Sequence, residues 1–158
     1  MSIHLFMSNN SVYNTTLSCD SLGIHYDVTK SSDTGIITVT RWESSTNTNH
    51  FVAEFCYPLA SPDKVRLGGQ TEWMKRGEFL KRVEGHPLSL SRTFMGNNGT
   101  QYRWKIHWPK WVLCYASKDE VNQEPLVKYH YHPLRKNASY LEICDPAVMS
   151  SLDNISHS

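Results

Sequence analysis

The chain has 158 residues, which is enough for one domain with its own hydrophobic core. Its 16 lysine and arginine residues nearly balance its 15 aspartate and glutamate residues, and the formal net charge is +1. A general nucleic-acid-binding protein needs a basic excess to neutralise phosphates, so we expect no nucleic-acid partner. We also expect a single domain over residues 1–158.

The amino-terminal segment and the cysteines indicate the cellular compartment. Residues Met1–Ser8 have neither the basic start nor the sustained apolar run of a signal peptide. No later stretch reaches the roughly eighteen apolar residues that span a bilayer. Four cysteines are scattered along the chain without a CxxC pair, a spacing that favours reduced thiols. These features predict a cytoplasmic protein.

Short apolar segments separated by turn residues predict β-strands throughout the first half of the chain. The clearest is Ile36–Trp42, because it is rich in β-branched residues. Arg76–Arg82 fits either one helical turn or irregular structure. The strands expected in this half cover Ile3–Met7, Ser11–Thr16, Gly23–Val28, Ile36–Trp42, His50–Tyr57 and Asp63–Leu67.

The strongest strand signal of the chain lies in the second half, at Tyr102–Ile106. Large apolar residues alternate there with cations, directly after the glycine-rich turn Gly96–Gly99. Asp145 as N-cap and Pro146 at the first helical position predict a short C-terminal helix. Short strands, regular turns and almost no helix predict an all-β antiparallel barrel or sandwich. The further strands expected are Ser89–Met95, Thr100–His107, Trp111–Ala116, Glu124–His132 and Ser139–Cys144.

Several motifs together resemble one uncharacterised family of mushroom-type fungi, which is defined only as a domain of unknown function. The motifs are Lys64–Gly69, Leu90–Phe94 with Gly96–Gly99 and Tyr102–Lys105, Pro125–Tyr129, and Tyr140–Ile143. This family is similar to the tubby C-terminal and LURP-one-related proteins, and the resemblance implies an antiparallel tubby-like β-barrel. Tubby-like domains bind phosphoinositide headgroups and scramblase-like relatives act at membranes. No run of lysine and arginine in this sequence matches such a headgroup site.

The chain departs from this family after Asp145. Family members continue into a long apolar helix that fills the barrel, whereas Ala147–Ile155 turns polar here. A barrel without this plug would offer an apolar cavity for a small hydrophobic ligand or lipid. Alternatively, aromatic side chains or a helix from a second copy would fill the interior.

One segment, Val127–His132, carries the candidate acid–base groups. On a strand, Lys128, His130 and His132 point to one side and Tyr129 to the other. Two histidines at i and i+2 form half of a metal site, but no metal motif accompanies them, and we predict no metal and no cofactor. If the histidines line a cavity, His130 or His132 acts as a general base, and Tyr102, Tyr129 and Lys105 polarise a substrate oxygen. The candidates for a third metal ligand are His50, His86, His107 and Glu142.

Two further groups of residues are candidate contacts for a ligand. The first surrounds the strongest strand and fits either core packing or a hydrophobic rim for lipid insertion. Its members are Tyr102, Trp104, Lys105, Ile106, Trp108 and Trp111. The second is the compact basic cluster Lys75, Arg76, Lys81 and Arg82, which fits either a solvated loop or a site for anionic headgroups.

Three functions are compatible with this sequence. The first is a binding module for a hydrophobic small molecule or lipid, with docking on a membrane surface. The second is a small cofactor-free enzyme that acts on an apolar metabolite. The third is an interaction protein that forms a homodimer.

Overall fold

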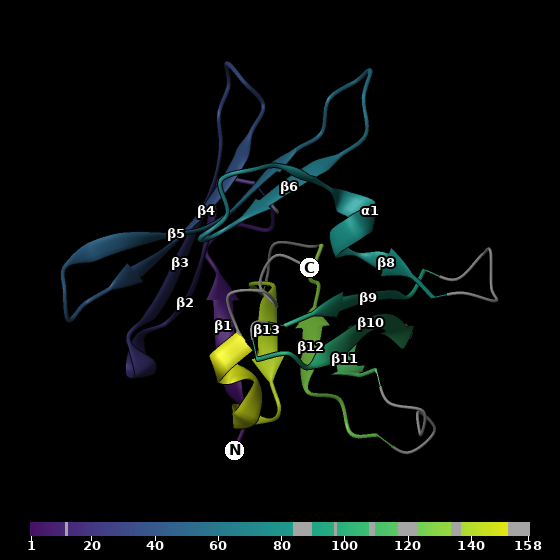
Figure 1. Ribbon diagram of the computed structural model, residues 1–158. Coiled ribbons are helices and arrows are strands. Elements are labelled where there is room, and N and C mark those ends of the chain that lie inside the picture. Colours follow the sequence, from purple (N-terminus) through teal and green to yellow (C-terminus); the bar gives the residue numbers. More distant parts are fainter. Residues whose placement is uncertain are drawn as a thin grey trace. The chain divides into compact units, whose positions relative to one another are not determined.

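The computed structural model describes residues 1–11, 13–83, 90–96, 98–107, 110–116, 123–133 and 137–151. Within these residues, thirteen strands form one sheet with the order β7-β6-β5-β4-β3-β2-β1-β13-β12-β11-β10-β9-β8 (Figure 1). The helical elements are short: η1 (Asp20–Leu22), α1 (Arg76–Phe79) and η3 (Pro146–Ser151). The all-β prediction is therefore confirmed.

The strand bounds follow the turn residues of the sequence. The strands of the first half are β1 (Ile3–Met7), β2 (Thr15–Cys19), β3 (Ile24–Lys30), β4 (Ile37–Glu43), β5 (Thr48–Cys56), β6 (Lys64–Leu67) and β7 (Met74–Lys75). Those of the second half are β8 (Lys81–Arg82), β9 (Arg92–Met95), β10 (Gln101–His107), β11 (Lys110–Tyr115), β12 (Val127–His130) and β13 (Tyr140–Ile143). The strand order has β7 at one end and β8 at the other, so the closed tubby-like barrel stays a prediction.

The chain divides into two compact units. Unit 1 comprises Met1–His4, Gly77–His130 and Leu141–Ser158, and unit 2 comprises Leu5–Arg76 and Tyr131–Tyr140. The expected single domain over residues 1–158 stays a prediction, and each unit is described by itself.

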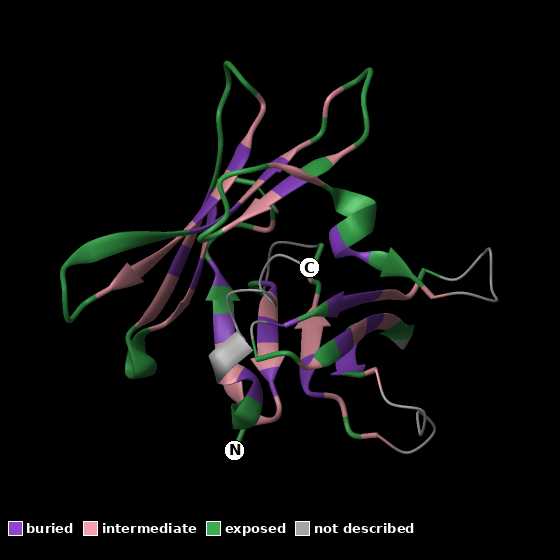
Figure 2. Ribbon diagram, in the orientation of Figure 1, coloured by how far each residue is buried: buried purple, intermediate pink, exposed green. Residues whose placement is uncertain are grey.

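In unit 2, the alternation of each strand separates a buried face from a more polar one. The antiparallel registers place Leu17 opposite Tyr26, and Val39 between Val28 and Ala53. All five side chains are buried, whereas the residues between them are more exposed. Figure 2 shows this alternation as bands of buried residues along β3, β4 and β5. The alternation that predicted the strands therefore also places the apolar side chains on one face, where they form the core of this unit.

One strand of unit 2 lies later in the sequence than predicted. The expected strand Ser11–Thr16 is wrong, because β2 begins at Thr15. Asn14 has a left-handed backbone with φ of 53°, which belongs to a turn and not to a strand. The hydroxyl of Thr15 accepts a hydrogen bond from the Asn9 amide at 3.1 Å and fixes this turn.

A bulge in β5 explains one glycine of the Gly68-Gly69 pair. The pairing of β4 with β5 shifts between Val39 and Thr40, so that Val52 becomes the extra residue of β5. The amide of Gly68 donates a hydrogen bond to the Val52 carbonyl at 2.7 Å. A Cβ atom on Gly68 would lie 2.9 Å from the Phe51 carbonyl oxygen, a backbone atom that cannot move aside alone. Glycine is therefore required here by a close approach of two backbones.

We expect Gly68→Ala to destabilise the protein by about 1–3 kcal/mol, because the bulge must shift to admit the methyl group. A thermal melt should show a decrease of Tm of roughly 2–10 °C. The matched control is Gly77→Ala, since a Cβ atom at Gly77 meets nothing within 4 Å. Equal Tm values for the two variants would contradict this account of Gly68.

In unit 1, a row of aromatic rings runs beside β9 and β10; three of the rings are buried and the last, that of Tyr115, is 37% exposed. The ring centroids of Phe79, Phe94, Tyr102 and Tyr115 follow one another at 5.8, 5.6 and 5.9 Å. Tyr102 is 1% exposed, and its hydroxyl accepts a hydrogen bond from the Asn98 side-chain amide at 2.9 Å. The buried phenol therefore has a polar partner from the preceding turn.

Two segments adopt helical structure of different kinds. Arg76–Arg82, for which the sequence left two alternatives, forms α1 and then β8. The predicted C-terminal helix is the 3-10 helix η3, and the Asp145 carboxylate accepts a hydrogen bond from the Ala147 amide at 2.9 Å. The predicted capping role of Asp145 is confirmed, and Leu152–Ser158 lie outside the described residues.

Candidate functional site

The predicted ligand-binding residues on the hairpin of β10 and β11 differ in how far their side chains are exposed. Tyr102 and Trp104 are buried, at 1% and 7% exposure, and belong to the core of unit 1. Ile106 and Trp111 lie directly opposite each other across the two strands and are 38% and 37% exposed. Trp108 lies outside the described residues. We call Ile106 and Trp111 the apolar pair of the hairpin.

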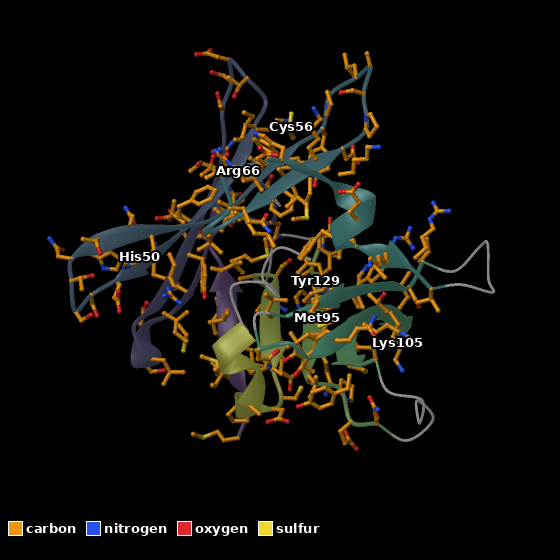
Figure 3. All side chains as sticks on the ribbon, in the orientation of Figure 1. His50, Cys56, Arg66, Met95, Lys105 and Tyr129 are labelled. Carbon is orange, nitrogen blue, oxygen red and sulfur yellow. The ribbon has the colours of Figure 1, made fainter. Side chains whose placement is uncertain are left out.

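The other face of the same strands carries cations. Val112 of β11 lies opposite Lys105 of β10 on one side and opposite Lys128 of β12 on the other. By the alternation of the strands, Arg103 and Lys110 share this face with Lys105 and Lys128. We call these four residues the basic face of unit 1. Figure 3 labels Lys105 of this group on β10.

The pKa values of two cysteines reflect the same arrangement. Burial raises the pKa of Cys114, while the positive charges of Lys105 and Arg103 oppose this increase. Burial likewise raises the pKa of Cys144, against the charge of Lys128 and a hydrogen bond from its ammonium group. Both thiols are therefore protonated at neutral pH. Cys114, opposite Arg103, lies on the basic face as a neutral side chain.

A histidine–carboxylate pair borders the basic face. His130 Nε2 and Glu142 Oε2 are 2.7 Å apart, and the two side chains are 10% and 19% exposed. Burial lowers the pKa of His130, and the charges of Lys110 and Lys128 act in the same direction, whereas the hydrogen bond to Glu142 opposes them.

The same contact lowers the pKa of the carboxylate. Burial alone would raise the pKa of Glu142, but the hydrogen bond with His130 and the charge of Lys128 outweigh it. At neutral pH the imidazole is therefore uncharged and donates its Nε2 hydrogen to an ionised Glu142. This pair is geometrically suited to orient His130 within the basic face.

The remaining candidate acid–base residues lie elsewhere. Tyr129 is opposite Trp111 across β11 and β12, and so lies on the other face of the sheet from Lys128 and His130. His132 belongs to unit 2, where its ring stacks on Tyr140 with the centroids 6.0 Å apart.

The candidate metal ligands are not grouped in the described part of the chain. There, no three histidine, cysteine, aspartate or glutamate side chains are placed to hold a metal ion. Glu142 contacts His130, and His50 contacts Glu43 at 2.8 Å. His86 and the side chain of His107 lie outside the described residues.

The basic cluster predicted from the sequence falls into two pairs. Lys75 and Arg76 belong to unit 2, where Arg76 forms an ion pair with Asp63 at 3.3 Å. Lys81 and Arg82 form β8 in unit 1 and are exposed. Each pair is thus exposed within its own unit.

The comparison with known proteins identifies the family. The profile of a family of unknown function (DUF6593) matches residues 10–158, and the chain belongs to this family. No curated protein and no solved structure matches the chain. Among the described residues, no helix combines the length and the apolarity that a membrane crossing requires.

The lowered pKa of His130 predicts how stability depends on pH. In the unfolded chain His130 titrates near its usual value of 6.5, whereas the folded protein binds this proton only at lower pH. The unfolded state therefore binds more protons as the pH falls through about 6.5, and the free energy of unfolding decreases. The lowered pKa of Glu142 adds to this loss only below its usual value of 4.5.

We expect denaturant titrations to show a decrease in stability from pH 7.5 to pH 5.5. The variant His130→Gln keeps a hydrogen-bond donor for Glu142 but cannot titrate, so it should show a weaker decrease. His50→Gln serves as the control because His50 is exposed on β5. An identical pH dependence for wild type and His130→Gln would refute the assignment of a neutral His130.

Proposed function

We propose that this protein is a cytoplasmic, non-catalytic lipid-binding module that docks on anionic membrane surfaces through the hairpin of β10 and β11. The observation that carries the proposal is the division of this hairpin between an exposed apolar pair and two cations. Ile106 and Trp111 project from one face, and Lys105 and Lys110 from the other. The resemblance to tubby-like proteins, whose relatives act at membranes, supports the same function.

The chemistry of the hairpin matches the interfacial region of a bilayer. Tryptophan is favoured at the boundary between headgroups and acyl chains, and an isoleucine beside it adds apolar area that water no longer contacts. Lysines near the surface of an anionic leaflet each contribute about 1 kcal/mol of attraction. Two such lysines correspond to about 2 kcal/mol, or roughly a 30-fold change in partitioning.

The net charge of the chain does not oppose this proposal. Lys105 and Lys110 form no ion pair with the described residues, so no described carboxylate is in contact with either ammonium group. A surface of this kind attracts anionic lipids even though the whole protein carries a formal charge of only +1. Its attraction acts within about one Debye length, roughly 8 Å at physiological ionic strength.

Vesicle sedimentation tests the proposal. Wild-type protein should bind vesicles that contain phosphatidylserine and should bind much less to vesicles of phosphatidylcholine alone. Replacing both lysines (Lys105→Gln with Lys110→Gln) should weaken binding roughly 30-fold. Replacing the apolar pair (Ile106→Ser with Trp111→Ser) should weaken it further and make the remaining binding strongly dependent on salt.

Matched controls remove the same chemistry from other places. Lys75→Gln with Lys81→Gln removes two cations of the cluster predicted from the sequence. Leu59→Ser with Leu90→Ser removes two exposed apolar side chains, at 109% and 56% exposure. Both controls should bind like wild type. Equal losses in the control and hairpin variants would show that the hairpin is not the docking element.

A further inference from the structure

We infer that the basic face of unit 1 is a binding site for one phosphomonoester group, held by Lys105, Lys110 and Lys128. This inference deepens the proposed function, on which its membrane arm rests, because it assigns a chemical class of headgroup. The same chemistry occurs in phosphatidic acid and in soluble phosphomonoesters.

The register brings the three lysines to one place. Lys105 and Lys128 lie on the two strands that flank Val112, and strands separated by one neighbour are roughly 10 Å apart. Lys110 lies on the middle strand, two residues from Val112, and its charge acts on His130 of β12. Long side chains from these positions can therefore reach a single ligand above the middle strand.

The three lysines of this face differ in how far the described carboxylates oppose their charge. Neither Lys105 nor Lys110 forms an ion pair within the described residues, whereas the charges of Lys128 and Glu142 act on each other. Glu142 already accepts a hydrogen bond from His130. Like charges on neighbouring strands repel one another. An anion that binds all three lysines therefore offsets this electrostatic repulsion.

The base of the site strengthens this attraction. Val112 and Cys114, which lie between the cations, are 2% and 3% exposed. Charges above a dry base interact more strongly than charges surrounded by water. All three lysines are half-buried, so part of their hydration is already lost before a ligand binds.

The number and type of cations select the class of anion. A phosphomonoester carries a charge of about −1.5 to −2 at neutral pH, whereas a carboxylate or a phosphodiester carries about −1. Arg103, the fourth cation of the basic face, already interacts with other groups of the protein and is not counted in the site. Lysine binds phosphate as a point charge, without the planar fork by which arginine recognises a carboxylate. Three ammonium groups around a tetrahedral group of oxygens therefore favour a phosphomonoester.

The first experiment uses glycerol 3-phosphate as a soluble probe. Isothermal titration calorimetry on the full chain should show one site, and thermal melts should show a Tm that increases with probe concentration. Lys128→Gln should weaken binding at least roughly tenfold, because a hydrogen bond to a charged group is lost. Lys64→Gln, at an exposed strand position of unit 2, is the matched control and should bind like wild type.

The second experiment separates the lipid source from the soluble one. Vesicles with phosphatidic acid and vesicles with phosphatidylserine are compared at equal surface charge. Wild type should prefer phosphatidic acid severalfold, and Lys128→Gln should lose this preference while it still binds both vesicles through the hairpin. A site for a soluble phosphomonoester would instead bind glycerol 3-phosphate without any preference between the vesicles.

The possible failures are distinguishable. Binding to phosphatidylserine vesicles that requires Ile106 and Trp111, without any response to glycerol 3-phosphate and without a preference for phosphatidic acid, keeps the proposed function and overturns this site. Binding of glycerol 3-phosphate that requires Lys128, in a protein that binds no vesicle, keeps the site and overturns the proposed function. Equal affinity of wild type and Lys128→Gln for glycerol 3-phosphate overturns the site in either case.

Discussion

The cross-strand register of β10, β11 and β12 determines what each face of unit 1 carries. Because the side-chain period of a strand is two, the pairing of Ile106 with Trp111 also places Lys105 next to Val112. A slip of one residue would move the core residue Trp104 to the outer face and bring a cation into the core. The buried ring of Tyr102 therefore fixes the register, and the register in turn assembles the cations that lie on the opposite face.

The sequence predicted individual strands better than it predicted which residues the strand pairing brings side by side. Alternation along Tyr102–Ile106 was sufficient to predict a strand with an apolar and a basic face, since this pattern is local. That Lys105 and Lys128 flank the same residue, Val112, was not predictable, because it depends on two successive pairings between segments separated along the chain. The contact of His130 with Glu142 was missed for the same reason, although both residues were candidates. The role of Gly68 likewise depends on the bulge of β5.

The net charge of the chain does not describe the basic face of unit 1. Cations and anions nearly balance over the whole chain, whereas cations predominate on this face. The charge of +1 summarises 16 cations and 15 anions. On the basic face, however, the nearby carboxylate of Glu142 is engaged by a neutral histidine. The hydrogen bond from neutral His130 leaves Glu142 ionised, and the charge of this carboxylate acts on Lys128. Lys105 and Lys110, which form no ion pair with the described residues, produce a local positive field that falls off over about a Debye length in water.

Two features of unit 1 lower the stability of the folded state without serving its core. Lysines on adjacent strands repel one another, and an exposed isoleucine–tryptophan pair leaves apolar area in water. The core of unit 1 consists of other residues, among them Tyr102, Phe94 and Leu113, which are buried. It therefore needs neither the lysines nor the exposed pair. Sequences tend to break such local rules where a ligand or a surface later satisfies them. The two features also lie on opposite faces of one hairpin, so that a single bilayer interface, with acyl chains below its headgroups, would satisfy both at once.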